Sequence, residues 1–136
     1  MVASIYALDH LVMNVADVNR SAEWFCKVLG AQRQDFQPGE DKATRTAVFF
    51  GAQKINLRPA DADTGDWFTG RAPTPGSDDL CFLTPESPDS VVNHLKDLGV
   101  AIVEGPVTRQ GARGALRSVY CRDPDGNLIE LSSYAD

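Results

Sequence analysis

The chain has 136 residues, 43% of them hydrophobic, and a formal net charge of −6, which suits one domain with a sizeable core. Its 13 Lys and Arg are scattered, so the basic surface that nucleic acids need is missing, and no apolar stretch is long enough to span a bilayer. The first residues lack the pattern of a signal peptide, and we expect a cytoplasmic protein whose partners include neither nucleic acid nor membrane.

The first half of the chain reads as one strand, one helix and three further strands. Residues 7–15 have the Val, Leu and Met content of a strand. Asp17 then stands where a helix N-cap belongs, and apolar residues at helical spacing follow until Gly30 ends the helix. Turn residues separate the three strands that complete this half, which we predict at 32–36, 44–50 and 53–58.

The second half repeats that order after a connector. Residues 59–76 are rich in Asp, Gly, Pro and Thr and show no periodicity. The pattern then predicts a helix over 91–98 that Gly99 ends. The tetrapeptide Asp123-Pro124-Asp125-Gly126 predicts a tight turn that makes the last two strands a hairpin. The strands of this half are predicted at 79–84, 101–104, 115–122 and 127–133.

An internal repeat supports this division. The segment from Leu8 to Leu11 recurs as residues 77–80, and the segment from Lys27 to Ala31 recurs as residues 96–100. Both pairs lie 69 residues apart (79 − 10 and 99 − 30), which indicates one duplicated strand–helix unit.

We therefore predict an α+β fold of two βαβββ modules within a single domain, residues 1–136. Module one covers 5–58, the connector 59–76 and module two 77–134. Each small sheet would cover one face with its helix, and the two together would form a curved mixed sheet around a central cleft. A concave sheet surface of this kind suits a small-molecule ligand.

Three segments give the chain a resemblance to a known family. They are Leu8-Asp9-His10-Leu11-Val12, Val28-Leu29-Gly30 and the stretch from Asp123 to Leu131, which reads DPDGNLIEL. The chain resembles the vicinal oxygen chelate superfamily, which includes glyoxalases, extradiol dioxygenases and bleomycin-resistance proteins. The resemblance covers nearly the whole chain and is specific for the superfamily, whereas the fold hosts many chemistries.

The resemblance implies a divalent metal in the cleft, held by side chains from the first and last strands of each module. At those positions this chain has His10, Asp79 and Glu130. An imidazole and two carboxylates suit Fe, Mn, Zn or Ni and leave positions open for substrate oxygens. His10 and Glu130 are also the candidate catalytic residues, with Glu130 as a general base.

The fourth position departs from the family pattern. Arg58 stands where a His often closes the strand, and Asn56 precedes it by two residues on the same face. A guanidinium does not ligate a metal, so Arg58 either replaces the metal by pairing with a carboxylate, which gives a metal-free pocket, or binds an anionic substrate at the rim. The sequence leaves open whether Asn56 or Arg58 faces Glu130.

Further residues are candidates for substrate binding. Asn56, Arg58, Phe50, Arg117 and Tyr120 complete this predicted set. The alternative for the two aromatic residues is an ordinary place in the core. Arg109, Arg113 and Arg117 flank a glycine-containing stretch that either reaches over an anionic ligand or is a solvated loop.

Three functional hypotheses follow, for a protein that we expect to be a homodimer, as members of this superfamily often are. The first is a metal-assisted lyase, isomerase, epimerase or ring-cleaving enzyme acting on a small oxygenated substrate. The alternative is a metal-free protein that binds a drug or natural product, like the bleomycin-resistance members. A third is cofactor-free catalysis by His10 and Glu130, with Arg58 stabilising an oxyanion.

Overall fold

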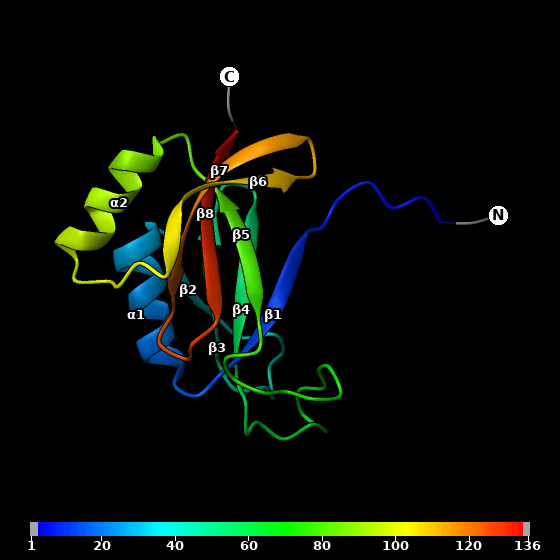
Figure 1. Cartoon of the computed structure of the whole chain (residues 1–136). Coiled ribbons are helices and arrows are strands. Elements are labelled where there is room, and N and C mark those ends of the chain that lie inside the picture. Colours follow the sequence, from blue (N-terminus) through cyan, green and yellow to red (C-terminus); the bar gives the residue numbers. More distant parts are fainter. Residues whose placement is uncertain (1–2, 135–136) are drawn as a thin grey trace. The chain divides into compact units, whose positions relative to one another are not determined.

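A computed structural model describes residues 3–134 of the chain (Figure 1). The chain divides between Thr74 and Pro75 into two compact units, each with its own four-stranded sheet and one helix. Both units have the element order βαβββ. The predicted α+β fold of two βαβββ modules is therefore confirmed.

The first unit contains a mixed sheet in the strand order β1-β4-β3-β2. Strands β1 and β4 are parallel, and the other pairs are antiparallel. The unit consists of β1 (His10–Val15), α1 (Val18–Leu29), β2 (Gln32–Phe36), β3 (Arg45–Phe50) and β4 (Gln53–Pro59).

Helix α1 begins and ends where the sequence predicts. The Asp17 side chain accepts a hydrogen bond from the backbone N–H of Arg20 at 3.0 Å, and Gly30 ends the helix with φ of 68°, a conformation that favours glycine. The helix buries Ala22, Phe25 and Val28 and contacts β2, β3 and β4. This apolar stripe covers one face of the first sheet.

The second unit repeats the arrangement with the strand order β5-β8-β7-β6. Strands β5 and β8 are parallel, and the other pairs are antiparallel. Helix α2 contacts β6, β7 and β8 and buries Val91 and Leu95. The unit consists of β5 (Asp79–Leu83), α2 (Pro88–Asp97), β6 (Glu104–Gly111), β7 (Gly114–Arg122) and β8 (Leu128–Tyr134).

The turn between β7 and β8 is the predicted one. The N–H of Gly126 donates to the carbonyl of Asp123 at 3.0 Å, and Asn127 donates from its amide side chain to the Asp123 carboxylate at 2.8 Å. The Asn127 side-chain oxygen in turn accepts from the backbone N–H of Asp78 at 2.9 Å. This turn thus fixes the hairpin register and joins it to the start of β5.

Two strand predictions differ from the structure. The first strand begins at His10 rather than at residue 7, and its pairing with β4 starts between His10 and Lys54. The strand predicted at 101–104 is wrong: β6 runs over Glu104–Gly111 and passes through Pro106. A register irregularity between Glu104 and Val107 accommodates this proline in the edge strand. Within residues 3–134, neither helix has the length and apolar character needed to cross a membrane.

Candidate functional site

Each sheet has a face opposite its helix, which we call the helix-free face. Alternate residues of a strand point to opposite faces, and in β8 the apolar Ile129 and Leu131 are buried on the side that α2 covers. Glu130 therefore lies on the second helix-free face. The strand register places it beside Tyr120 of β7 and Cys81 of β5, so residues far apart in the sequence meet there.

Two serine hydroxyls hold the Glu130 carboxylate. Its Oε2 atom accepts hydrogen bonds from Ser118 at 2.6 Å and from Ser132 at 3.3 Å. Both serines are fully buried and lie 2.7 Å apart, and the Cys81 thiol donates to the Ser132 hydroxyl at 3.3 Å. Hydrogen bonds to a charged group contribute about 1.5–3 kcal/mol each. The carboxylate is thus fixed in orientation while its side chain still lines a cavity.

Tyr120 connects Glu130 to a charged pair on β6. Its hydroxyl oxygen accepts a hydrogen bond from Nε of Arg109 at 3.2 Å. Nη2 of Arg109 lies 3.2 Å from the Glu104 carboxylate. Burial raises the pKa of the Tyr120 phenol, the hydrogen bond from Arg109 partly offsets this rise, and the nearby Glu130 carboxylate adds to it. Tyr120 is therefore protonated at neutral pH and can donate a hydrogen bond to a ligand.

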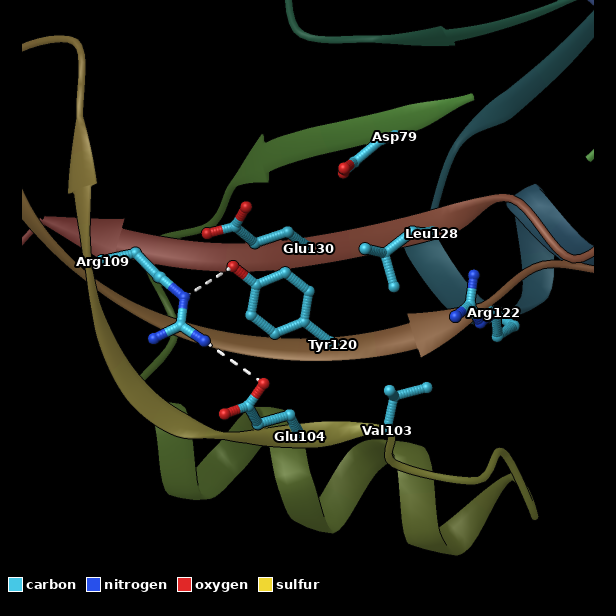
Figure 2. A pocket seen from close by; sticks show the side chains of 8 residues that line it. All are labelled: Asp79, Val103, Glu104, Arg109, Tyr120, Arg122, Leu128 and Glu130. Atoms are coloured by element: carbon cyan, nitrogen blue, oxygen red, sulfur yellow. Dashed lines mark hydrogen bonds and ion pairs between the residues drawn. The ribbon is translucent and has the colours of Figure 1, made fainter. Parts of the chain in front are cut away.

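Two cavities adjoin these side chains within the second unit. One, of about 290 Å³, is lined by Asp79, Glu104, Arg122 and their neighbours, and Figure 2 shows the Tyr120 ring between Glu130 on one side and Glu104 on the other. The second, of about 540 Å³, is lined mainly by uncharged residues, among them Leu83 and Leu116. Arg109, Tyr120 and Glu130 line both.

The predicted metal ligands are distributed over both units. Asp79 and Glu130 line the same cavity in the second unit, from β5 and β8. His10 belongs to the first unit, where its Nδ1 atom lies 2.8 Å from the Asp9 carboxylate. Among residues 3–134, no group of three or more His, Cys, Asp or Glu side chains is arranged to hold a metal.

The strand register shows which residue of the first unit is the counterpart of Glu130. In the second unit Cys81 pairs with Glu130, and in the first unit Val12 pairs with Asn56. Val12 and Cys81 correspond in the 69-residue repeat, so Asn56 is the counterpart of Glu130. Asn56 is 9% exposed, and its amide oxygen has no hydrogen-bond partner within the described part of the chain.

Arg58 has a structural role, which corrects both alternatives predicted for it. The side chain is fully buried. Its Nε and Nη2 atoms donate to the Trp67 carbonyl at 3.0 and 2.8 Å, and Nη2 also donates to the Ala62 carbonyl at 2.8 Å. Nη1 donates to the Asn14 side chain and to the carbonyls of residues 59 and 60. All five N–H groups are thereby bonded, to Asn14 and to carbonyls of residues 59–67, and none remains for a substrate or a distant carboxylate.

Two predicted substrate-binding residues, Phe50 and Arg117, lie on the faces opposite Asn56 and Glu130. Arg117 and Tyr120 are three positions apart on β7, so their side chains point to opposite faces. Phe50 pairs with Gln53, which likewise puts it on the face opposite Asn56. The glycine-containing stretch before β7, for which the sequence left open a segment over a ligand or a solvated loop, is a tight hairpin with Gly111 paired to Gly114. Phe50 and Arg117 are therefore not part of the face that bears Glu130 or its counterpart.

The roles of Ser118 and Ser132 were not predicted from the sequence, and Arg109 was considered only as one of three arginines beside the glycine-containing stretch. The tight turn at 123–126 contains a signal for the serines, because counting outward from it pairs Tyr120 with Glu130 and Ser118 with Ser132. No comparable signal placed Arg109 next to Tyr120. Its place beside Tyr120 depends on the β6 register, which the irregularity near Pro106 shifts.

Comparisons with known proteins agree with this fold. Residues 7–131 match the model of the Glyoxalase/Bleomycin resistance protein/Dioxygenase superfamily, and the chain belongs to that family. It is 46% identical to Virulence protein STM3117 of Salmonella typhimurium over 129 residues, which cover 93% of this chain and 83% of that protein.

Solved structures are similar over nearly the whole chain. The integron cassette protein VCH_CASS1 from the mobile metagenome of V. cholerae has a TM-score of 0.90 and 43% identity, covering 99% of this chain and all of the other. TnmS3, an antibiotic binding protein from Streptomyces sp. CB03234, has a TM-score of 0.72 and 25% identity, covering 98% and 99%.

Proposed function

We propose that this protein is an enzyme that acts on a small oxygenated organic substrate, with Glu130 as the general base. The observation that carries the proposal is the geometry around Glu130, whose Oε2 atom is held by Ser118 and Ser132 while the side chain lines two cavities. A base that is already oriented loses little entropy when it reacts. Family membership supports a small-molecule substrate but does not define the reaction.

The proposal includes a divalent metal, Fe, Mn, Zn or Ni, bound by His10, Asp79 and Glu130, with Asn56 as a fourth ligand. Two observations support this donor set. Asn56 has a buried amide oxygen that no described residue satisfies, and the hydrogen bond from His10 Nδ1 to Asp9 leaves Nε2 as the ligating nitrogen. When bound, the ion would polarise substrate oxygens and make a neighbouring C–H bond more acidic.

The chain's own residues would then carry the proton. Glu130 takes a proton from the carbon next to a polarised carbonyl and holds it on its carboxyl group. Returning it to an adjacent carbon completes an isomerisation, and delivering it to a leaving oxygen completes an elimination. Ser118 and Ser132 keep the carboxylate in position throughout, since both donate to the same oxygen atom.

A second function is metal-free binding of a drug or natural product. Two observations favour it: the similarity to the antibiotic binding protein TnmS3, and the cavity of about 540 Å³ lined mainly by uncharged residues. Apolar cavities of this size suit drug-sized ligands. A ligand would be held there without any change to its covalent structure.

The proposal also includes a homodimer. Ile5, Tyr6 and Leu8 are 90%, 100% and 66% exposed, and large apolar side chains that lie exposed together favour contact with another chain. Light scattering coupled to gel filtration measures the mass directly. A mass of 14.8 kDa at micromolar concentration would rule the dimer out.

Metal content tests the enzyme proposal. Tag-free protein is dialysed against each of the four metals and analysed by elemental mass spectrometry, with His10→Ala, Asn56→Ala and Glu130→Ala as variants. We expect near-stoichiometric metal that the His10 and Glu130 substitutions both abolish and Asn56→Ala weakens. His94→Ala, which alters an exposed histidine on α2, is the control. Protein that takes up none of these metals would overturn the metal-dependent reaction and favour the binding function.

A further inference from the structure

The second helix-free face combines a cationic group with an apolar cavity. Arg109 and Tyr120 line the charged cavity of about 290 Å³ and also the larger cavity next to Leu83, Leu116 and Tyr134. A ligand that occupies both would have a polar head beside Arg109 and an apolar part in the larger space. Glu130 lies at the same junction.

Arg109 is held in place with hydrogen-bonding capacity left over. Nε donates to Tyr120, Nη1 donates to the Thr108 carbonyl at 3.2 Å, and Nη2 pairs with Glu104. Among the described residues, these contacts leave one N–H on each terminal nitrogen. The Arg109 and Glu104 side chains are 41% and 55% exposed, and an exposed ion pair of this kind is weak. Glu104 therefore orients Arg109 and still leaves its guanidinium accessible to a ligand.

Tyr120 adds a second donor beside the guanidinium. Because its oxygen accepts the Nε–H of Arg109, the phenolic proton must point away from Arg109. The guanidinium carbon lies 5.5 Å from the centroid of the Tyr120 ring, so the guanidinium contacts the ring that bears the hydroxyl. A hydroxyl donor next to a guanidinium matches the two oxygens of a carboxylate.

We propose that Arg109 and the Tyr120 hydroxyl bind the carboxylate of the substrate, which makes the substrate a small organic acid with an apolar part. This inference rests on the proposed function. Since Tyr120 and Glu130 are cross-strand neighbours, a carboxylate held by Tyr120 places the adjoining carbon atoms next to Glu130. Binding the acid group thus presents a C–H bond to the base.

Nuclear magnetic resonance of the full-length chain tests this without knowledge of the natural substrate. Butyrate, a carboxylate with a short apolar part, is titrated while the Nε–H signal of Arg109 is followed, with the uncharged butyramide as the matched ligand. We expect butyrate to shift this signal saturably and butyramide to bind about tenfold more weakly or not at all. Equal binding of both ligands, or no saturable shift with butyrate, would overturn the proposal.

Variants distinguish a site from general attraction to positive charge. Arg109→Gln and Tyr120→Phe should each weaken butyrate binding about tenfold, whereas Glu104→Gln should strengthen it severalfold by removing the competing carboxylate. The control is Arg33→Gln, because Arg33 forms a surface pair with Asp35 at 3.2 Å and is 38% exposed. If Arg33→Gln weakened binding as much as Arg109→Gln, the assignment would be wrong.

The butyrate experiment and the metal-content experiment can fail independently of each other. Butyrate binding is measured on metal-free protein, so stoichiometric metal without butyrate binding would remove the substrate class alone. Butyrate binding that depends on Arg109, in a protein that takes up no metal, would retain the carboxylate site and remove the metal-dependent reaction.

Discussion

The two helix-free faces have the same strand arrangement but differ in the chemistry of their side chains. At equivalent positions, the first sheet has Asn56 where the second has Glu130, and Arg58 where the second has Ser132. In the first unit the largest buried polar side chain, Arg58, holds the connector. On the second helix-free face, the buried polar groups beside Glu130 are the hydroxyls of Ser118 and Ser132, which orient its carboxylate.

This difference shows how a duplicated module can divide two tasks. A fully buried arginine whose donors are all used contributes structure and is unavailable to a ligand, whereas Arg109, half exposed and only partly bonded, remains available. The neighbouring strands β3 and β7 differ in the same way. Ala47 of β3 pairs with Asn56, whereas Tyr120 of β7 pairs with Glu130. The residues suited to bind and to transfer protons are therefore concentrated in the second unit.

Arg58→Met should destabilise the first unit, and it should lower the free energy of unfolding more than the other substitutions discussed below. The substitution leaves the carbonyls of Trp67 and Ala62 without their donor, and losing one partner of a buried charged network costs about 3–5 kcal/mol. Urea denaturation measures the free energy of unfolding. The control Arg33→Met, on an exposed ion pair, should change it by less than about 0.5 kcal/mol. Equal effects of the two would refute a structural role for Arg58.

Ser118→Ala tests the second helix-free face and should lower the free energy of unfolding less than Arg58→Met does. Ser118 is fully buried and donates to Glu130 at 2.6 Å, so its loss removes one hydrogen bond and leaves Ser132 as the remaining hydroxyl donor to Oε2. We expect the free energy of unfolding to fall by about 1.5–3 kcal/mol. Ser133→Ala, the adjacent residue on the other face of β8, is the control. If both serine variants matched the wild type, the carboxylate would not depend on this network.

The sequence predicts the two modules, and the errors in the predicted elements and residue positions have physical causes. Hydrophobic periodicity and the caps at Asp17 and Gly30 fix α1, since these signals are local. The role of Arg58 was not predictable, because its acceptors are backbone carbonyls of an irregular connector. Strand β6 was misplaced because Pro106 reads as a strand breaker, whereas the edge strand accommodates it.

Asn56→Leu sharpens the comparison, because two buried asparagines differ in their bonding. The Asn56 amide oxygen has no partner within the described residues, so a leucine of similar size should change the free energy of unfolding by less than about 1 kcal/mol in either direction. Asn127→Leu is the matched control and should cost about 2–4 kcal/mol, since it breaks bonds to Asp123 and Asp78. A large loss in Asn56→Leu would mean that the amide is satisfied without a ligand.

The smallest expected effect concerns Asp78, the counterpart of Asp9 in the repeat. Asp9 pairs with His10, whereas burial, and then the nearby charge of Asp123, raises the pKa of Asp78 above its ordinary value of 3.8. A raised folded-state pKa means that this group's stabilising contribution is complete below pH 3.8 and is lost as the pH rises through the folded-state value. Asp78→Asn should therefore gain stability relative to the wild type as the pH rises towards neutral. Urea midpoints across this range measure it, with Asp61→Asn in the connector as the control for losing one negative charge. A difference in the opposite direction would show that the charge of Asp78 is better accommodated in the folded protein than in the unfolded chain.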